Sequence, residues 1–302
     1  MAIVLKNSIL CLTIEEPGQV YNNSRFDWTG NISQVLFENK FIFCSVETAK
    51  GFDHKRHGQG LYNEFGITKP IGYEDCFVGE KFPKIGVGLL TRKSNDAYNF
   101  LEAYEIDPFE IQIEKGEEWI KYTAFPKDCR GYSTKLIKKI KLSGNSFTID
   151  YELENTGTKK IQTNEYCHNF IAVNRSDIDE HYTLRVPCKT NKTSSMFEAL
   201  NPENAVVLNA NSVNFKLSPE KDFFFSPLTE FQSLNGEWEI THDGMGIGMK
   251  ESTDFVPEMM NVWGCKHALS PELFIKIDLD PGQKQKWRRT YKFYYLLPDR
   301  QL

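Results

Sequence analysis

Residues 135–153 read KLIKKIKLSGNSFTIDYEL, and this stretch decides the fold class. Apolar and polar side chains alternate on both sides of Ser143-Gly144-Asn145, which is the period of a β-strand with one buried face. Glycine and asparagine between two such runs are typical of a tight hairpin turn. The stretch therefore predicts two neighbouring antiparallel strands.

Similar runs continue in both directions along the chain. The further predicted strands are 8–15, 32–37, 41–45, 274–279 and 287–297. Glu38-Asn39-Lys40 joins two of them as a second hairpin turn. Asp280-Pro281-Gly282-Gln283 joins the last two, with proline presetting φ and glycine supplying the permissive position.

Helical signals are weak throughout the chain. No long segment carries apolar residues at helical spacing with capping residues at its ends. Strands without intervening helices argue against a parallel βαβ sheet. We also find no fixed-period repeat, low-complexity tract or linker. The prediction is an all-β protein with few short helices, built as one large antiparallel β-sandwich domain over residues 1–302.

The composition is that of an ordinary globular protein, with 40% hydrophobic residues, 25% charged residues and a net charge of −5. This charge balance shows no basic excess for a nucleic-acid partner. No apolar stretch approaches the roughly 20 residues of a membrane span, and the N-terminus lacks the pattern of a signal peptide. We therefore expect a cytoplasmic protein without a nucleic-acid or membrane partner. The seven cysteines are scattered and form no C-x-x-C pair, which argues against a disulfide framework and a zinc site.

The first candidate site is the segment 163–171, TNEYCHNFI. On a strand, Glu165 and Asn169 would face one side, and Tyr166 and His168 the other. An imidazole beside aromatic rings suits a carbohydrate, which presents apolar CH faces as well as hydroxyls. The structural alternative is a half-buried histidine that only satisfies a backbone carbonyl.

A second candidate is Glu272, which stands at the start of an otherwise apolar strand. Pro271 precedes it, and a proline suits the first residue of a strand or an edge. Glu272 is therefore either a solvated residue at a sheet edge or a buried base with a raised pKa.

A third candidate is the glycine-rich loop 54–66, which is dense in hydrogen-bond donors and acceptors. Loops on a rigid sheet commonly carry binding residues. The alternative is a loop that is merely solvated.

Residues 147–173, FTIDYELENTGTKKIQTNEYCHNFIAV, resemble the aldose 1-epimerase (galactose mutarotase) superfamily. One strand ends in an N-T-G turn, and the next carries His168 and Asn169 at the places of the family's N-H-x-Y-F-N motif. The turn at 280–283 and the aromatic strand after it are similar to the family's P-G-E turn and final strand. Residues 25–32, RFDWTGNI, look like the start of uncharacterised bacterial mutarotase-like proteins.

The resemblance implies a large antiparallel β-sandwich with a sugar site on a concave sheet face, and no metal or organic cofactor. In that family a histidine acts as general acid toward the ring oxygen of the sugar, and a late glutamate acts as general base toward the anomeric hydroxyl. Carried over, these residues would be His168 and Glu272. The candidate substrate-binding residues are Arg56, His57, Glu64, Asn169 and Trp263.

The predicted function is that of an aldose 1-epimerase, which interconverts the α and β anomers of a hexose. Opening a cyclic hemiacetal requires one proton to reach the ring oxygen while another leaves the anomeric oxygen, and two positioned groups of opposite role can do this. The family's late glutamate stands in an E-T-Q-like context that this chain lacks. That departure favours the alternative, a non-catalytic carbohydrate-binding or sugar-sensing protein on the same fold. The expected partner is a small-molecule sugar, and the expected state is a monomer or homodimer.

Overall fold

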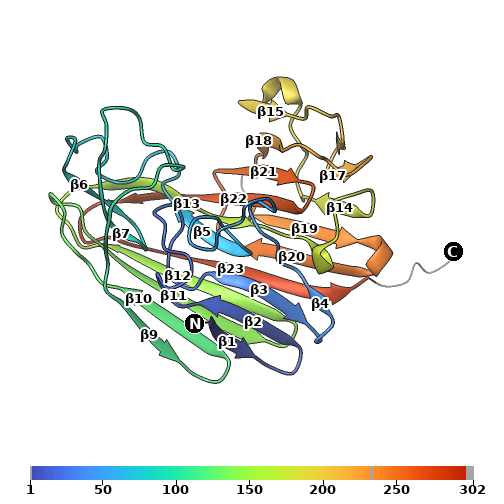
Figure 1. The fold of residues 1–302 in the computed structure, drawn as a ribbon, viewed down its shortest axis with the longest axis horizontal. Coiled ribbons are helices and arrows are strands. Elements are labelled where there is room, and N and C mark those ends of the chain that lie inside the picture. Colours follow the sequence, from blue (N-terminus) through green and yellow to red (C-terminus); the bar gives the residue numbers. More distant parts are fainter. Residues whose placement is uncertain (1, 232–233, 297–302) are drawn as a thin grey trace.

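The computed structural model describes residues 2–231 and 234–296, and antiparallel strands dominate it (Figure 1). Two ten-stranded sheets enclose a shared apolar core. The chain also forms a separate three-stranded sheet. The helices of the described residues are three short 3₁₀ turns: η1 (Val173–Arg175), η2 (Thr193–Ser195) and η3 (Asp243–Met245). The predicted all-β antiparallel sandwich is confirmed.

The first sheet carries the candidate site residues except Arg56 and His57, which lie in the loop between β4 and β5. Its order is β1-β2-β3-β5-β13-β22-β21-β18-β15, and β4 pairs with β3. The strand bounds are β1 (Ala2–Lys6), β2 (Leu10–Glu15), β3 (Ile32–Phe37), β4 (Phe41–Ile42), β5 (Leu61–Phe65), β13 (Ile161–Asn169), β22 (Ala268–Leu279), β21 (Met259–Cys265), β18 (Phe223–Thr229) and β15 (Glu198–Leu200).

The second sheet has the order β16-β17-β14-β19-β20-β23-β12-β11-β10-β9, and the small sheet has the order β6-β7-β8. The bounds of the second sheet are β16 (Val206–Leu208), β17 (Ser212–Phe215), β14 (Tyr182–Arg185), β19 (Glu237–His242), β20 (Ile247–Thr253), β23 (Lys284–Tyr295), β12 (Ser146–Asn155), β11 (Thr134–Ser143), β10 (Trp119–Ala124) and β9 (Ile111–Lys115). Those of the small sheet are β6 (Lys81–Lys84), β7 (Gly88–Thr91) and β8 (Ile106–Pro108). Within the described part of the chain, no helix is both long and apolar enough to cross a membrane.

The hairpin that opened the sequence analysis is present as β11 and β12. Ser143 pairs with Ser146 across a two-residue turn, in which Gly144 has a φ of 57°. Buried residues alternate with half-buried or exposed ones along both strands, as the binary pattern predicts. The β3–β4 hairpin also turns where expected, at residues 38–40. The predicted last strand corresponds to β23, and its expected end at Leu297 lies outside the described residues.

The expectation that Pro271 begins a strand or stands at a sheet edge is wrong. Pro271 lies inside β22, a central strand between β13 and β21. The backbone ladder between β13 and β22 runs from Ile161 to Glu165 and resumes as a bridge at Ile171. In the gap, the side chain of Asn169 donates to the Pro271 carbonyl (2.6 Å). The nitrogen and the carbonyl of a strand residue point to the same side, so the missing N–H of Pro271 faces this gap, where the ladder needs no donor.

Candidate active site

The candidate site is built on β13, whose alternation separates its side chains into two groups. Tyr166 and His168 line a cavity on one face of the sheet. Glu165 and Asn169 point to the other face and are fully buried. This division follows from the period of two in a β-strand, and it agrees with the faces predicted from the sequence.

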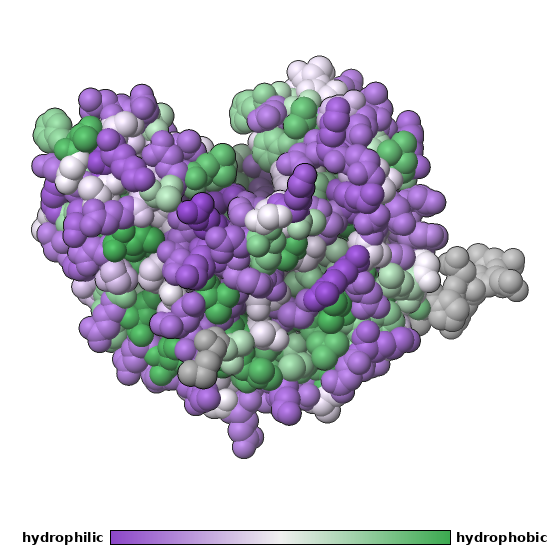
Figure 2. Space-filling view, in the orientation of Figure 1, coloured by the Kyte–Doolittle hydropathy of each residue, from purple (hydrophilic) through white to green (hydrophobic). Residues whose placement is uncertain are grey.

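The cavity has a volume of about 1010 Å³ and lies between two lobes of the molecule. Figure 2 shows the surface hollowed between a lobe that carries β6 and β7 and another that carries β15 and β18. Loop residues of the first lobe, such as Phe100, and strand residues of the second, such as Phe224, line its walls. The volume is at the upper end of the range for small-molecule pockets, about 300–1,000 Å³.

His168, Glu272 and Ser270 form a triangle of short contacts at the wall of this cavity. His168 Nε2 lies 3.2 Å from Glu272 Oε1, and His168 Nδ1 lies 2.8 Å from Ser270 Oγ. Ser270 Oγ also donates to Glu272 Oε1 (3.3 Å) and accepts the Asn169 backbone N–H (3.0 Å). His168 and Glu272 are only 5% and 4% exposed, so both groups are largely removed from water.

Burial changes the protonation of this pair. It lowers the pKa of His168 well below 6.5, and the positive charge of Arg25 lowers it further. Burial raises the pKa of Glu272 to about 8, although Arg25 and the Ser270 hydrogen bond oppose the rise. At neutral pH Glu272 is therefore mostly protonated and His168 is neutral, so the pair carries little net charge. Two neighbouring groups with opposite pKa shifts are typical of acid–base sites.

Arg25 places a positive charge at the cavity wall and is held by a buried and a half-buried acid. Its Nε donates to Glu64 Oε2 (2.9 Å) and its Nη1 to Glu47 Oε1 (2.5 Å). Glu64 also accepts the Tyr166 hydroxyl (2.7 Å) and forms an ion pair with Lys84 (3.3 Å). Burial lowers the pKa of Lys84 to about 8. Glu64 is fully buried beneath the cavity, and its hydrogen bonds orient Arg25 and Tyr166.

Aromatic rings surround the imidazole. Phe170 stacks on His168 with ring centroids 4.0 Å apart, and Trp263 meets it edge-on at 5.4 Å. Gly58 lets the loop that carries His57 lie close to Phe170, since a Cβ at position 58 would come within 2.4 Å of that ring. The packing limits the ring positions open to His168 and leaves Trp263 at the cavity as an apolar surface.

The structure brings some of the sequence-predicted residues together and separates others. His57 and Trp263 line the cavity with His168 and Glu272. Arg56 lines a smaller adjoining hollow, and its side chain is 72% exposed.

Asn169 and Glu64 do not line the cavity, contrary to the prediction that they contact substrate. Asn169 lies on the opposite face of β13 from His168, since the two are adjacent on a strand. Its amide bonds to the Pro271 carbonyl and to Tyr291. Glu64 is covered by Arg25 and Tyr166.

Sequence reasoning missed Arg25, Ser270 and Asn261. Ser270 and Asn261 each lie two residues along a strand from a predicted residue, Glu272 and Trp263, so the period of two could have indicated them. Arg25 precedes β3 in an irregular segment, and no local pattern connects it with β13.

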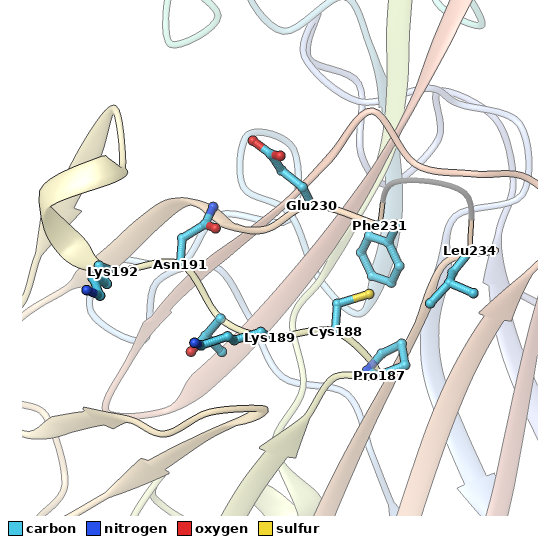
Figure 3. Close-up of a pocket in the computed structure, with 9 residues that line it drawn as sticks. Pro187, Cys188, Lys189, Asn191, Lys192, Glu230, Phe231 and Leu234 are labelled. Carbon is cyan, nitrogen blue, oxygen red and sulfur yellow. The ribbon is translucent and has the colours of Figure 1, made fainter.

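A second hollow of about 490 Å³ lies elsewhere on the surface (Figure 3). Lys189 and Lys192 lie on one side of it and Phe231 and Leu234 on the other. Its described lining residues include no buried acid–base pair like that of His168 and Glu272. Across residues 2–231 and 234–296, no group of three or more His, Cys, Asp or Glu side chains is placed to hold a metal ion.

Comparison with solved structures identifies the fold. A putative aldose 1-epimerase from Escherichia coli K12 superposes with a TM-score of 0.61 at 11% sequence identity, covering 98% of this chain and 99% of that one. A galactose mutarotase-like protein from Lactobacillus casei gives 0.58 at 10% identity, covering 97% and 100%. The Slr1438 protein from Synechocystis gives 0.58 at 12% identity, covering 98% and 96%.

These similarities show that the chain has the galactose mutarotase-like β-sandwich fold over nearly its whole length. At such identities they define the fold alone. Neither the known protein-family models nor the curated protein sequences contain a match to this chain.

Proposed function

We propose that the protein binds a reducing sugar in the cavity and acts as an aldose 1-epimerase that interconverts the α and β anomers. The observation that carries the proposal is the 3.2 Å contact between His168 Nε2 and Glu272 Oε1 at the cavity wall. The aromatic surface of Trp263 beside this pair supports a carbohydrate ligand. The fold supports the same class, since the solved structures that share it include putative aldose 1-epimerases.

The close approach of His168 and Glu272 suits this reaction because both oxygens that exchange protons are bound to the same carbon. The ring oxygen and the anomeric hydroxyl of a pyranose are both substituents of C1. An acid and a base must therefore converge on one point of the sugar and need not stand on opposite sides of its ring. A sugar that binds beside the pair can replace their mutual contact with one hydrogen bond to each group.

The protonation states of the two side chains at neutral pH favour Glu272 as the acid and His168 as the base in ring opening. These roles are the reverse of those implied by the family resemblance. Glu272 carries the proton at neutral pH because of its raised pKa. Ser270 has one hydroxyl proton and donates it to Glu272 (3.3 Å). It then accepts a hydrogen bond from His168 Nδ1–H (2.8 Å), which leaves Nε2 free to accept a proton.

In the proposed step, Glu272 donates its proton to the ring oxygen as the bond between that oxygen and C1 breaks. His168 Nε2 takes the proton of the anomeric hydroxyl, whose oxygen becomes the carbonyl oxygen of the open-chain aldehyde. Rotation about the C1–C2 bond presents the other face of the carbonyl. Reversal of both proton transfers closes the ring as the other anomer, so the cycle consumes no co-reactant.

Polarimetry on freshly dissolved α-galactose and α-glucose, in weak buffer, tests the proposal. We expect the wild type to accelerate mutarotation of at least one sugar. Glu272→Gln and His168→Asn should each lower kcat/KM by about 10²–10⁴-fold. The rate should also fall above about pH 8, where Glu272 loses its proton. Glu198→Gln, which changes an exposed glutamate on the same cavity, is the matched control and should remain active.

Failure of the wild type to accelerate either sugar would overturn the epimerase proposal. Calorimetry on the same sugars then identifies the alternative. Binding without turnover would indicate a non-catalytic sugar-binding protein on this fold.

A further inference from the structure

Asn261 carries an unpaired polar atom at the cavity. It lies in β21, lines the cavity and is 6% exposed. Its Oδ1 is buried, and no described residue donates a hydrogen bond to it. A buried polar atom without a partner destabilises a fold, and most such atoms in proteins are paired. Asn261 therefore has unused hydrogen-bonding capacity at the ligand site.

Other buried amides in this sheet show the contrast. Asn169 donates to the Pro271 carbonyl (2.6 Å) and accepts the Tyr291 hydroxyl (3.0 Å). Asn63 donates to Glu165 (2.6 Å) and accepts from Lys138 (2.6 Å). Both amides lie away from the cavity, and both are bonded through oxygen and nitrogen. Of these three amides, Asn261 is the one that lines the cavity and the one whose oxygen is unpaired, which points to a ligand as its partner.

The strand register places Asn261 directly beside the acid–base pair. Asn261 pairs with Glu272 in the antiparallel β21–β22 ladder. Residues opposite each other in such a ladder have Cβ atoms about 4.5–5.5 Å apart and point to the same face. Asn261 is therefore one side-chain position from the group that we propose to act at C1. Trp263, two residues along β21, lies on the same face and lines the cavity as well.

A carboxamide presents an acceptor oxygen and a donor nitrogen, so it can bind a sugar hydroxyl in either direction. The hydroxyl nearest to the anomeric centre is the one on the adjacent carbon, C2. A neutral amide can bind this hydroxyl without placing a second charge beside Glu272. A site built to hydrogen-bond a substrate hydroxyl discriminates against the analogue that lacks it, because its buried polar group is then left unpaired.

We infer that Asn261 binds the C2 hydroxyl of the sugar, which makes aldoses with a free 2-hydroxyl the substrate class. This inference rests on the proposed function, since it assumes that Glu272 and His168 act at C1. Asn261 is a specificity-determining residue in this arrangement, and it takes no part in the proton transfers.

A cycle of two variants and paired sugars tests the inference. Mutarotation is measured with galactose, glucose and their 2-deoxy counterparts, for the wild type and for Asn261→Ala. We expect the wild type to prefer each parent sugar over its 2-deoxy analogue by about 10-fold or more in kcat/KM, and Asn261→Ala to lose this preference. Thr68→Ala, which removes an exposed hydroxyl from the same cavity, is the control and should retain it.

Calorimetric binding of the same sugars separates failure of the inference from failure of the proposed function. Binding that depends on the 2-hydroxyl and on Asn261, without turnover, supports the inference and overturns only the epimerase activity. Equal use or binding of parent and 2-deoxy sugars by the wild type overturns the assignment of Asn261. A preference that persists in Asn261→Ala, or no binding of any of these sugars, overturns it as well. Asn261→Leu has a similar shape and no polar side-chain atom, so it serves as the second variant if Asn261→Ala does not fold, and it should lose the preference as well.

Discussion

The two faces of β13 differ in whether a buried acid has a cationic partner. On the inner face, Glu165 pairs with Arg289 (2.8 Å), and Arg289 pairs in turn with Glu251 (2.7 Å). On the cavity face, Glu272 contacts His168 and forms no ion pair with a lysine or arginine of the described residues. All three acids are buried, but the inner two are paired with a cation, whereas the acid at the cavity has none and keeps a proton. A buried acid without a cation is costly to the fold, so its place at a cavity is a mark of function.

The inner network also continues between the sheets with alternating charge. Asn63 links Glu165 to Lys138, and Lys138 lies 3.4 Å from Asp27. All of these side chains are nearly inaccessible to water. Such a network stabilises the fold only while each charge keeps its partner. The comparison predicts that changes on the inner face lower stability, whereas changes on the cavity face lower activity and alter how stability depends on pH.

The largest effect should come from breaking the inner network. Arg289→Met leaves Glu165 and Glu251 buried without a cation, so we expect the free energy of unfolding to fall by about 3–5 kcal/mol. Denaturation in guanidinium chloride measures this loss. Arg288→Met is the matched control, because the adjacent Arg288 is about half exposed and pairs with Asp150 at the surface. It should change stability by about 0–1 kcal/mol. Equal losses in the two variants would contradict a stabilising inner network.

On the cavity face, removing the acid should increase stability at high pH. The pKa of Glu272 is about 8 in the fold and about 4.5 in the unfolded chain, so between these values only the folded state holds the proton. Stability therefore falls as pH rises from about 4.5 to 8. Glu272→Gln cannot lose this proton and should exceed the wild type by about 2–4 kcal/mol at pH 8.5.

The same comparison at pH 4.5 is the control, because the wild-type carboxyl is then protonated in the fold and the two proteins should be nearly equal. Urea denaturation of both proteins at each pH gives the difference. A difference between Glu272→Gln and wild type that does not change with pH would show that Glu272 is not held protonated.

The smallest of the three effects should come from Ser270→Ala. Ser270 is a positioning residue that bonds to His168 Nδ1 and orients the imidazole. Without its hydroxyl, we expect kcat to fall by about 10-fold with little change in KM, because a wrongly oriented base loses part of its catalytic effect. The pH–rate profile should shift as well, since Ser270 also bonds to Glu272 and lowers its pKa. Loss of stability with an unchanged pH profile would indicate a purely structural role.

Local sequence patterns were sufficient to predict the strands and the part of the site that lies on β13. The alternation around Gly144 predicted the β11–β12 hairpin, and the alternation around His168 predicted which neighbours share its face. Lys138 departs from the alternation of apolar and polar residues in β11. It stands at an inward position of β11 between Leu136 and Ile140, and a lysine in that phase implies a buried acid.

The rest of the site depends on contacts between distant parts of the chain. Arg25 meets Tyr166 across 141 residues, and Ser270 meets His168 across 102. We expected Pro271 at an edge because proline lacks an N–H, which can be known from the sequence. The Asn169 amide that bonds to the Pro271 carbonyl comes from another strand, which the sequence does not reveal. No local pattern contains such information.

The amino-acid sequence by itself determined that this chain forms antiparallel strands and which face of each strand is apolar, because the period of two is a property of the backbone. The tertiary structure alone decided which strands became neighbours. The β13–β22 pairing placed His168 beside Glu272, and the β21–β22 pairing placed Asn261 opposite it. Burial then set the protonation of His168 and Glu272, because a pKa depends on what surrounds the group in space and not on its neighbours in the chain.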